Sequence, residues 1–200
     1  MMDIYPKIRI CISAYFNGSD AEYRVNACYA IVYCFLAQTY NNFEIYIHHD
    51  GPLDDTTIAD KFRAISDKIT FIDNLEHKGN WGFYHRYSVS LMEPKPDWVL
   101  YTNEDNYYVP TFLETMINTA LSHNSKMVYC NMVHSHHGYQ VLNTYPAVCN
   151  IDMGAFITHI DLIECTLFNN YSQTADGWYA EQLASKTNPI KVDGILFTHN

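Results

Sequence analysis

Glu104 and Asp105 are adjacent acids that directly follow an apolar segment, residues 97–101, with the composition of a buried strand. A hard divalent cation prefers carboxylate oxygens, and a cation that also binds a diphosphate needs only one or two of them from the protein. The pair therefore fits a metal that helps to hold a nucleotide. A cap on the helix expected near Pro110, or a plain solvated turn, explains the two acids equally well, and the residues alone favour neither.

Two further carboxylates have a similar double interpretation. Asp50 ends a predicted strand, where it can accept hydrogen bonds from a base N–H or from ribose hydroxyls; an Asp-Gly turn at the same place needs no ligand. Asp176 opens a predicted helix, where a lone carboxylate can act as a general base on a hydroxyl. Because Asp is also a favoured helix cap, capping is the better interpretation of Asp176 when its position is considered alone.

Ten histidines raise the question of a zinc site. Two groups of them stand out in the sequence, namely His48 with His49, and the cluster of His134, His136 and His137. Neither group has the i, i+4 spacing with which a helix presents two histidines to zinc. We therefore predict that both groups lie in surface loops.

Three more polar residues have weaker signals. Arg86 and Lys78 are the basic residues nearest to the glycine-containing loop at residues 79–82, where they could meet a phosphate or could simply be solvated. His199 follows the last predicted strand, and by itself it is expected to be a frayed terminus.

Alternating strands and helices must position these residues. Strands are predicted at residues 7–15, 43–49, 69–72, 97–101, 127–131, 154–158 and 190–197, and helices at 21–38, 56–66, 83–92, from 110 onward, 161–167 and 175–185. This order favours an α/β sandwich with a largely parallel sheet, in which ligands bind beyond the carboxyl ends of the strands. Tyr15, Asp50 and residues 103–105 all follow predicted strands, so we expect them to converge at one edge of the sheet.

The composition limits the class of protein. The 200 residues suit one globular domain, and 12 basic against 22 acidic residues give a net charge of −10, which disfavours nucleic acid and anionic membranes as partners. Six cysteines without a CxxC pair, and no apolar leader at the N-terminus, predict reduced and mostly buried thiols in a cytosolic, soluble protein. No apolar run is long enough to predict a transmembrane segment.

Five segments, taken in order, resemble the GT-A nucleotide-sugar fold and, within it, the inverting family 2 glycosyltransferases. They are residues 10–17, 36–51, 97–110, 152–156 and 175–181, and together they extend over nearly the whole chain. The resemblance implies a Rossmann-like α/β/α sandwich with a mostly parallel central sheet. It also implies one catalytic domain over residues 1–200, with a nucleotide-sugar-binding half (1–105) and an acceptor-binding half (106–200), which can be part of a longer polypeptide.

The resemblance also implies a role for each candidate. The donor nucleotide would be held by five residues, Ala14, Tyr15, Asp50, Arg86 and Glu104. The metal, Mn²⁺ or Mg²⁺, would be bound by Asp105 and His199. Asp176 would be the general base on the acceptor hydroxyl in a single displacement with inversion. The implied partners are a nucleotide-sugar, UDP-sugars being favoured over GDP-sugars, and a hydroxyl of a glycan or glycoconjugate.

The chain departs from the family pattern at two positions. Asn103 stands where the usual D-x-D motif has its first acid, and Pro52 stands where a serine is usual. Two alternatives are therefore kept. A nucleotidyltransferase would be expected to have a glycine- and arginine/lysine-rich loop after the first strand, and residues 13–18 lack that basic character. The other alternative is a nucleotide- or carbohydrate-binding domain without catalysis.

Overall fold

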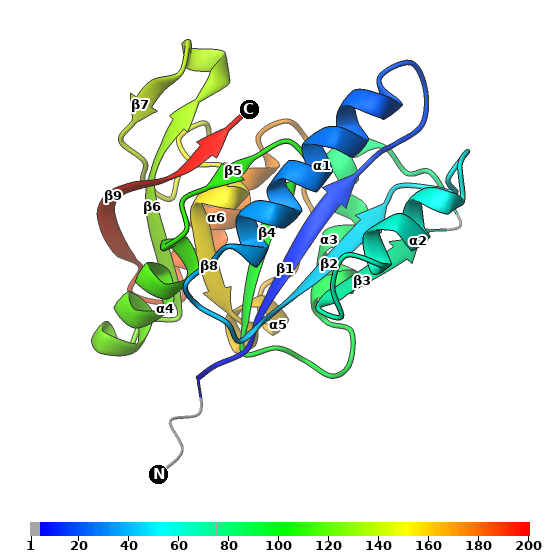
Figure 1. The fold of residues 1–200 in the computed structure, drawn as a ribbon. Helices are drawn as coiled ribbons and strands as arrows, with labels where there is room; N and C mark the ends of the chain where they lie inside the picture. Colours follow the sequence, from blue (N-terminus) through cyan, green and yellow to red (C-terminus); the bar gives the residue numbers. More distant parts are fainter. Residues whose placement is uncertain (1–4, 75) are drawn as a thin grey trace.

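A single mixed sheet forms the centre of the computed structural model, which describes residues 5–74 and 76–200 (Figure 1). Its strands are β1 (Ile8–Ala14), β2 (Phe43–His49), β3 (Ile69–Asp73), β4 (Trp98–Asn103), β5 (Tyr107–Tyr108), β6 (Met127–His134), β7 (Gln140–Leu142), β8 (Phe156–His159) and β9 (Ile190–His199). Within the described residues the strand order is β3-β2-β1-β4-β8-β6-β9-β5, and β7 pairs with β6. The four strands from β3 to β4 are parallel, whereas β8 is antiparallel to both of its neighbours.

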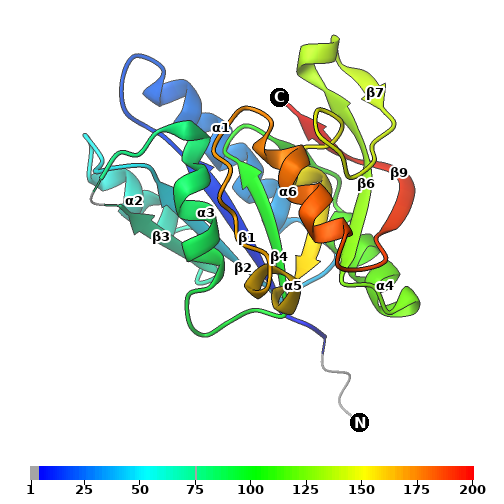
Figure 2. The ribbon, with the colours of Figure 1, turned by 180° about the vertical axis from the view of Figure 1, so that it is seen from behind.

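Helices cover both faces of this sheet. They are α1 (Ala21–Leu36), α2 (Thr57–Arg63), α3 (Phe83–Ser90), α4 (Phe112–His123), α5 (Ile160–Glu164) and α6 (Ala175–Ala184). Helices α1, α2 and α4 lie on one face, and α3, α5 and α6 lie on the other (Figures 1 and 2). The α/β/α sandwich predicted from the sequence is confirmed.

The central strands are buried on both faces because helices cover them. All seven residues of β1 are buried, and so are all residues of β2 except Glu44. A strand that is buried on both sides needs a continuous apolar run rather than an alternating one. The sequence Ile-Arg-Ile-Cys-Ile-Ser-Ala of β1 has that character, apart from Arg9 and Ser13.

Two predictions about histidines are wrong. His48 and His49 are fully buried in β2 instead of lying in a surface loop, because β2 runs between β1 and β3 beneath the helices. His48 Nε2 lies 3.0 Å from Ser13 Oγ, and His49 Nε2 accepts a hydrogen bond from the Phe16 amide at 2.8 Å. His199 is not frayed, since it is the final residue of β9, where it pairs with the end of β6.

Other sequence expectations are refined. The short strands β5 and β7 were not predicted, and the loop at residues 79–82 contains a 3₁₀ turn, Asn80–Gly82. All six cysteines are free thiols as predicted, although Cys149 and Cys165 are exposed. Among the residues that the structure describes, no helix combines the length and apolar character that crossing a membrane requires.

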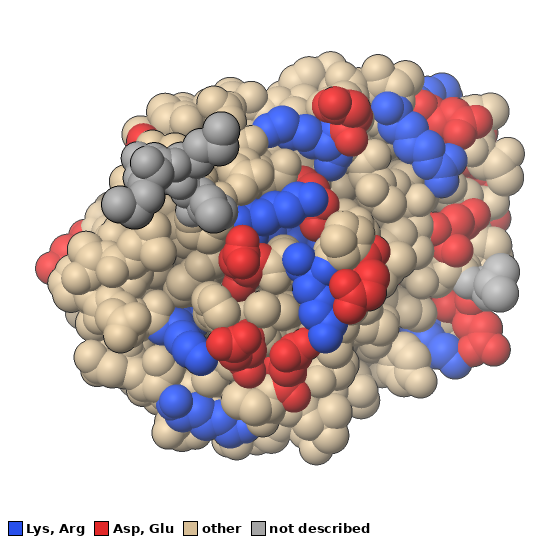
Figure 3. All heavy atoms as spheres, turned by 90° about the horizontal axis from the view of Figure 1, so that it is seen from below, with Lys and Arg blue, Asp and Glu red and all other residues tan. Residues whose placement is uncertain are grey.

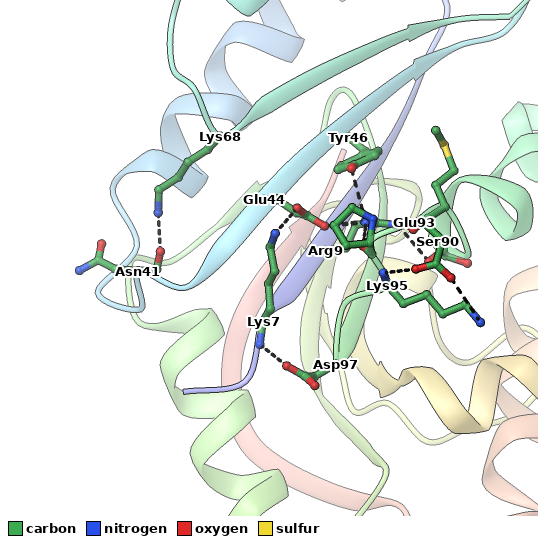
Figure 4. A network of polar contacts seen from close by, with 12 residues as sticks. Lys7, Arg9, Asn41, Glu44, Tyr46, Lys68, Ser90, Glu93, Lys95 and Asp97 are labelled. Carbon is green, nitrogen blue, oxygen red and sulfur yellow. Dashed lines mark hydrogen bonds and ion pairs between the residues drawn. The ribbon is translucent and has the colours of Figure 1, made fainter. Parts of the chain in front are cut away.

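The amino end of the sheet is held together by Arg9, whose side chain is fully buried (Figure 4). Its guanidinium pairs with Glu44 at 2.7 Å and lies over the ring of Tyr46. It also donates to four backbone carbonyls at and after the end of α3, those of Val89, Ser90, Met92 and Pro94. Arg9 thus ties β1 and β2 to the segment that leads into β4.

On the surface seen from this side, basic and acidic side chains are interspersed (Figure 3).

Candidate functional site

The carboxyl ends of β1, β2 and β4 open into a cleft with a volume of about 700 Å³. Of the eight residues to which the resemblance assigns a role, seven line it, namely Ala14, Tyr15, Asp50, Glu104, Asp105, Asp176 and His199. The expected convergence at one sheet edge is therefore observed, and residues from both halves of the chain take part. Arg86, the eighth candidate, is buried behind the wall of the cleft.

Glu104 and Asp105 follow β4 directly. Glu104 is 6% exposed, and its Oε1 lies 2.6 Å from Nη1 of Arg24, a residue of α1 that the sequence did not point to. Burial raises the pKa of both acids above their ordinary values. The N-cap of α4 is Thr111 and not Asp105, so the capping alternative is wrong.

Asp50 is occupied by contacts within the protein. Its Oδ1 accepts the amide of Lys78 at 2.8 Å, and its Oδ2 accepts the amide of Gly79 at 2.7 Å. Two imidazoles, those of His77 and His85, lie 3.0 and 3.3 Å from the same carboxylate. Asp50 therefore anchors the loop at residues 77–79, which borders the cleft. Its partners lie about 30 positions further along the chain, so no local sequence motif indicates this role.

Tyr15 provides an aromatic surface beside this loop. Its ring stacks on His49 with 5.6 Å between centroids and 10° between planes, and it lies 4.9 Å from the ring of His77. Both Tyr15 and His77 line the cleft. Rings held in this way can stack on a planar base.

Asp176 lies in the first turn of α6, whose N-cap is Thr174, so the capping interpretation of Asp176 is wrong. Within the described part of the chain, its Oδ1 is buried without a hydrogen-bond partner and lies 3.7 Å from Arg86 Nη1. Burial and then the neighbouring carboxylate of Asp152 raise the pKa of Asp176 well above its ordinary value, and Arg86 opposes the rise. A carboxylate with a raised pKa is better matched to proton transfer near neutral pH.

His199 and Asp152 together form another part of the cleft wall. His199 Nε2 lies 3.7 Å from Asp152 Oδ2, and its ring stacks on His134 with centroids 4.2 Å apart. Burial and the nearby imidazoles of His199 and His137 lower the pKa of His134 to about 4. His136 and His137 are exposed in a 3₁₀ turn (Ser135–His137), as expected for a surface loop, whereas His134 is the last residue of β6; all three line the cleft. Asp152 was part of a recognised segment, but nothing local distinguished its side chain.

Asp105 and His199 are the candidate ligands for a divalent metal in the cleft. No group of three or more His, Cys, Asp or Glu side chains within residues 5–74 and 76–200 is arranged to hold a metal ion. Asp105 and His199 interact electrostatically, and Nδ1 of His199 is buried without a hydrogen-bond partner among the described residues. A carboxylate oxygen and an imidazole nitrogen suit Mn²⁺, and two protein ligands suffice when a diphosphate supplies others. The donor set therefore fits a metal shared with a diphosphate.

Comparison with known families identifies the chain. The model of the family described as glycosyl transferase family 2 matches residues 24–150, which is more than half of the sequence. The chain belongs to glycosyltransferase family 2. A search of curated protein sequences finds no significant match for this family 2 member.

Solved structures with the same fold include S. aureus TarS and a mannosyltransferase. S. aureus TarS 1–349 superposes with a TM-score of 0.75 at 15% identity, covering 97% of this chain and 60% of TarS 1–349. Its complex with UDP-GlcNAc gives 0.72 at 14%, covering 96% and 58%. Mannosyltransferase PcManGT from Pyrobaculum calidifontis, in complex with GDP-Man and Mn²⁺, gives 0.70 at 15%, covering 98% and 59%. This structural similarity shows that the family 2 chain has the GT-A fold. The chain spans about three fifths of the length of these relatives.

Proposed function

We propose that the chain is an inverting glycosyltransferase that moves a sugar from a nucleotide-sugar to a hydroxyl of a glycan or glycoconjugate. The observation that supports this most strongly is Asp176, a partly exposed carboxylate in the cleft that Tyr15 and Asp105 also line. Among the described residues its buried Oδ1 has no hydrogen-bond partner, and Arg86 lies at 3.7 Å. Family membership favours sugar transfer over the nucleotidyltransferase alternative. A binding domain without catalysis is an outcome that the experiments below would reveal.

In the proposed reaction, Asp176 accepts the proton of the acceptor hydroxyl as its oxygen bonds to the anomeric carbon. The bond from that carbon to the diphosphate breaks, and the electron pair leaves with the nucleoside diphosphate. Attack from the face opposite the leaving group inverts the anomeric configuration. A general base of this kind accelerates transfer by about 10²–10⁴-fold.

The donor is proposed to lie along the ends of β1, β2 and β4. Its base would stack on Tyr15, beside Ala14 and the loop held by Asp50, and its ribose would lie near Glu104. We favour a UDP-sugar; among the structures that share the fold, one has UDP-GlcNAc bound and another GDP-Man. Arg86 lies behind the wall, so its effect on the donor would be indirect.

A thermal-shift screen of UDP-, GDP- and dTDP-sugars, each with Mn²⁺ and with EDTA, tests donor binding. A ligand present at about 100 times its Kd stabilises the native state by about 2.7 kcal/mol, which for a chain of this size raises Tm by roughly 5–11 °C. We expect the largest shift with a UDP-sugar in Mn²⁺. No shift with any of the sugars would contradict the proposal, and a shift without any release of nucleoside diphosphate would favour a binding domain.

Asp105→Ala tests the metal site. Asp105 and His199 are proposed to hold Mn²⁺ or Mg²⁺, which when bound would neutralise negative charge on the leaving diphosphate. We expect the variant to weaken UDP binding by about tenfold or more in Mn²⁺ and by less than about twofold in EDTA, because only the metal-dependent part is lost. Isothermal titration calorimetry with UDP measures both. An equal loss under the two conditions would remove the metal role from Asp105.

A further inference from the structure

Arg86, on α3, places a buried positive charge directly behind the cleft, with 2% of the residue exposed. Its Nε donates to Ser13 Oγ at 2.8 Å, and its Nη2 donates to Asn103 Oδ1. Its Nη1 lies 2.9 Å from Met153 Sδ and 3.7 Å from Asp176 Oδ1. Because a guanidinium is planar and its donors point in fixed directions, these contacts orient it toward the acceptor side of the cleft.

The hydrogen bond from Arg86 to Asn103 offers a reason why this chain has an amide where the D-x-D pattern has its first acid. An amide oxygen accepts a hydrogen bond but has no net charge, and the same holds for the hydroxyl of Ser13. These two groups therefore orient the guanidinium without neutralising it. The carboxylate of Asp176 lies at ion-pair distance from the same group.

We propose that Arg86 is a positioning residue for Asp176. We also propose that residue 103 is an amide because a carboxylate there would form an ion pair with Arg86 and weaken the pairing of Arg86 with Asp176. The inference rests on the proposed role of Asp176 as the base, since a general base must be ionised to accept a proton. Arg86 would act through charge and orientation, and it would not touch the sugar.

The groups around Asp176 have opposite effects on the pKa of its carboxyl group. Asp152, from the segment before β8, adds a second negative charge, and burial removes water; both disfavour the ionised carboxylate. Arg86 from α3 and a backbone contact at Met153 favour it. These are the described groups that act on the carboxyl. Without the charge of Arg86, a larger fraction of Asp176 would hold a proton and be unable to accept one.

Asn103→Asp is the sharpest test, because it changes one atom type and introduces the acid that the family usually has. A carboxylate at 103 would pair with Arg86 and add a negative charge near Asp176, so the pKa of Asp176 would rise. An opposite charge at this range lowers a carboxyl pKa by about 1–3 units, and loss of part of that effect predicts a rise of about 1 unit. The base would then be protonated over a wider acidic range.

The measurement is a pH titration of the Asp176 side-chain carbon by ¹³C NMR in EDTA, assigned with Asp176→Asn. We expect a midpoint about 1 unit higher in Asn103→Asp and an unchanged midpoint in Asn41→Asp. Asn41 is exposed and precedes β2 at the other end of the sheet, so it adds the same charge far from the cleft. An unmoved midpoint in Asn103→Asp would overturn the proposal, whether or not any donor is turned over.

Kinetics give a second readout. On the acidic side of the pH profile, kcat of Asn103→Asp should fall about tenfold with little change in donor KM, and it should recover at higher pH. Arg86→Lys, which keeps the charge, should retain more activity than Arg86→Met. A higher kcat in Asn103→Asp, or equal losses in the two Arg86 variants while both remain folded by circular dichroism, would overturn the proposal.

The two experiments separate the inference from the proposed function. If wild type releases no nucleoside diphosphate but the Asp176 midpoint moves as expected, the pairing with Arg86 holds and the transferase proposal fails. If wild type turns over a donor and the midpoint does not move, the transferase proposal holds and the role of Arg86 is wrong.

Discussion

Asp176→Asn is expected to lower kcat by about 10²–10⁴-fold while leaving donor affinity within about twofold of wild type. The amide has nearly the same shape as the carboxylate but cannot accept a proton from the acceptor hydroxyl. Because Oδ1 of Asp176 is buried, bulk water cannot readily replace this carboxylate as the base. Initial rates of nucleoside diphosphate release and calorimetric titration of the donor measure the two quantities separately.

Asp67→Asn is a matched control for this substitution. Asp67 is exposed between α2 and β3, and the same chemical change there should leave both kcat and donor affinity unaltered. Turnover of Asp176→Asn near the wild-type level would show that Asp176 is not the base. A parallel loss of donor binding would instead place its main effect on the architecture of the cleft.

Arg9→Met is expected to be the most destabilising of the substitutions considered. Methionine has a similar length but removes one of the two cations that pair with Glu44, leaving only Lys7, and it leaves the carbonyls of Met92 and Pro94 without this donor. Removing one member of a buried ion pair costs about 3–5 kcal/mol, which for a chain of this size lowers Tm by roughly 6–20 °C. Thermal unfolding followed by circular dichroism measures the change.

Arg63→Met provides the comparison. Arg63 pairs with Asp60 at 2.9 Å on the surface of α2 and donates to the Phe71 carbonyl; its side chain is about half exposed and that of Asp60 is largely exposed. An exposed pair contributes at most about 1 kcal/mol, so this variant should unfold within roughly 4 °C of wild type. If the two variants lost the same stability, the network around Arg9 would not be what holds the amino end of the sheet.

Much of the fold could be predicted because the parallel strands have long apolar runs. β2 was placed at residues 43–49, as observed, since a buried strand between helices leaves a clear pattern in sequence. β5 and β7 were missed because two or three residues are too few to show a period. Their pairing depends on β9 and β6, which are distant in sequence.

The site was predictable as a set of strand ends but not as a set of contacts. Tyr15, Asp50 and Asp105 could be grouped because parallel strands end at the same edge. The four contacts of Asp50 and the nearness of Asp152 to Asp176 arise from loops that meet only in the folded chain. The burial of His48 and His49 was missed for a related reason, since polarity suggested a surface and the covering helices decided otherwise.

The position of β9 has a consequence for the order in which the molecule is made. β9 lies between β6 and β5, although it follows every other strand in the chain. On a ribosome, β1 to β4 can pair with one another while residues 190–199 are still being synthesised. Tyr107 and Tyr108 must wait for β9 before they have a strand to join. The edge of the cleft formed by β1, β2 and β4, where we propose that the donor binds, can thus form during translation before the wall that contains His199.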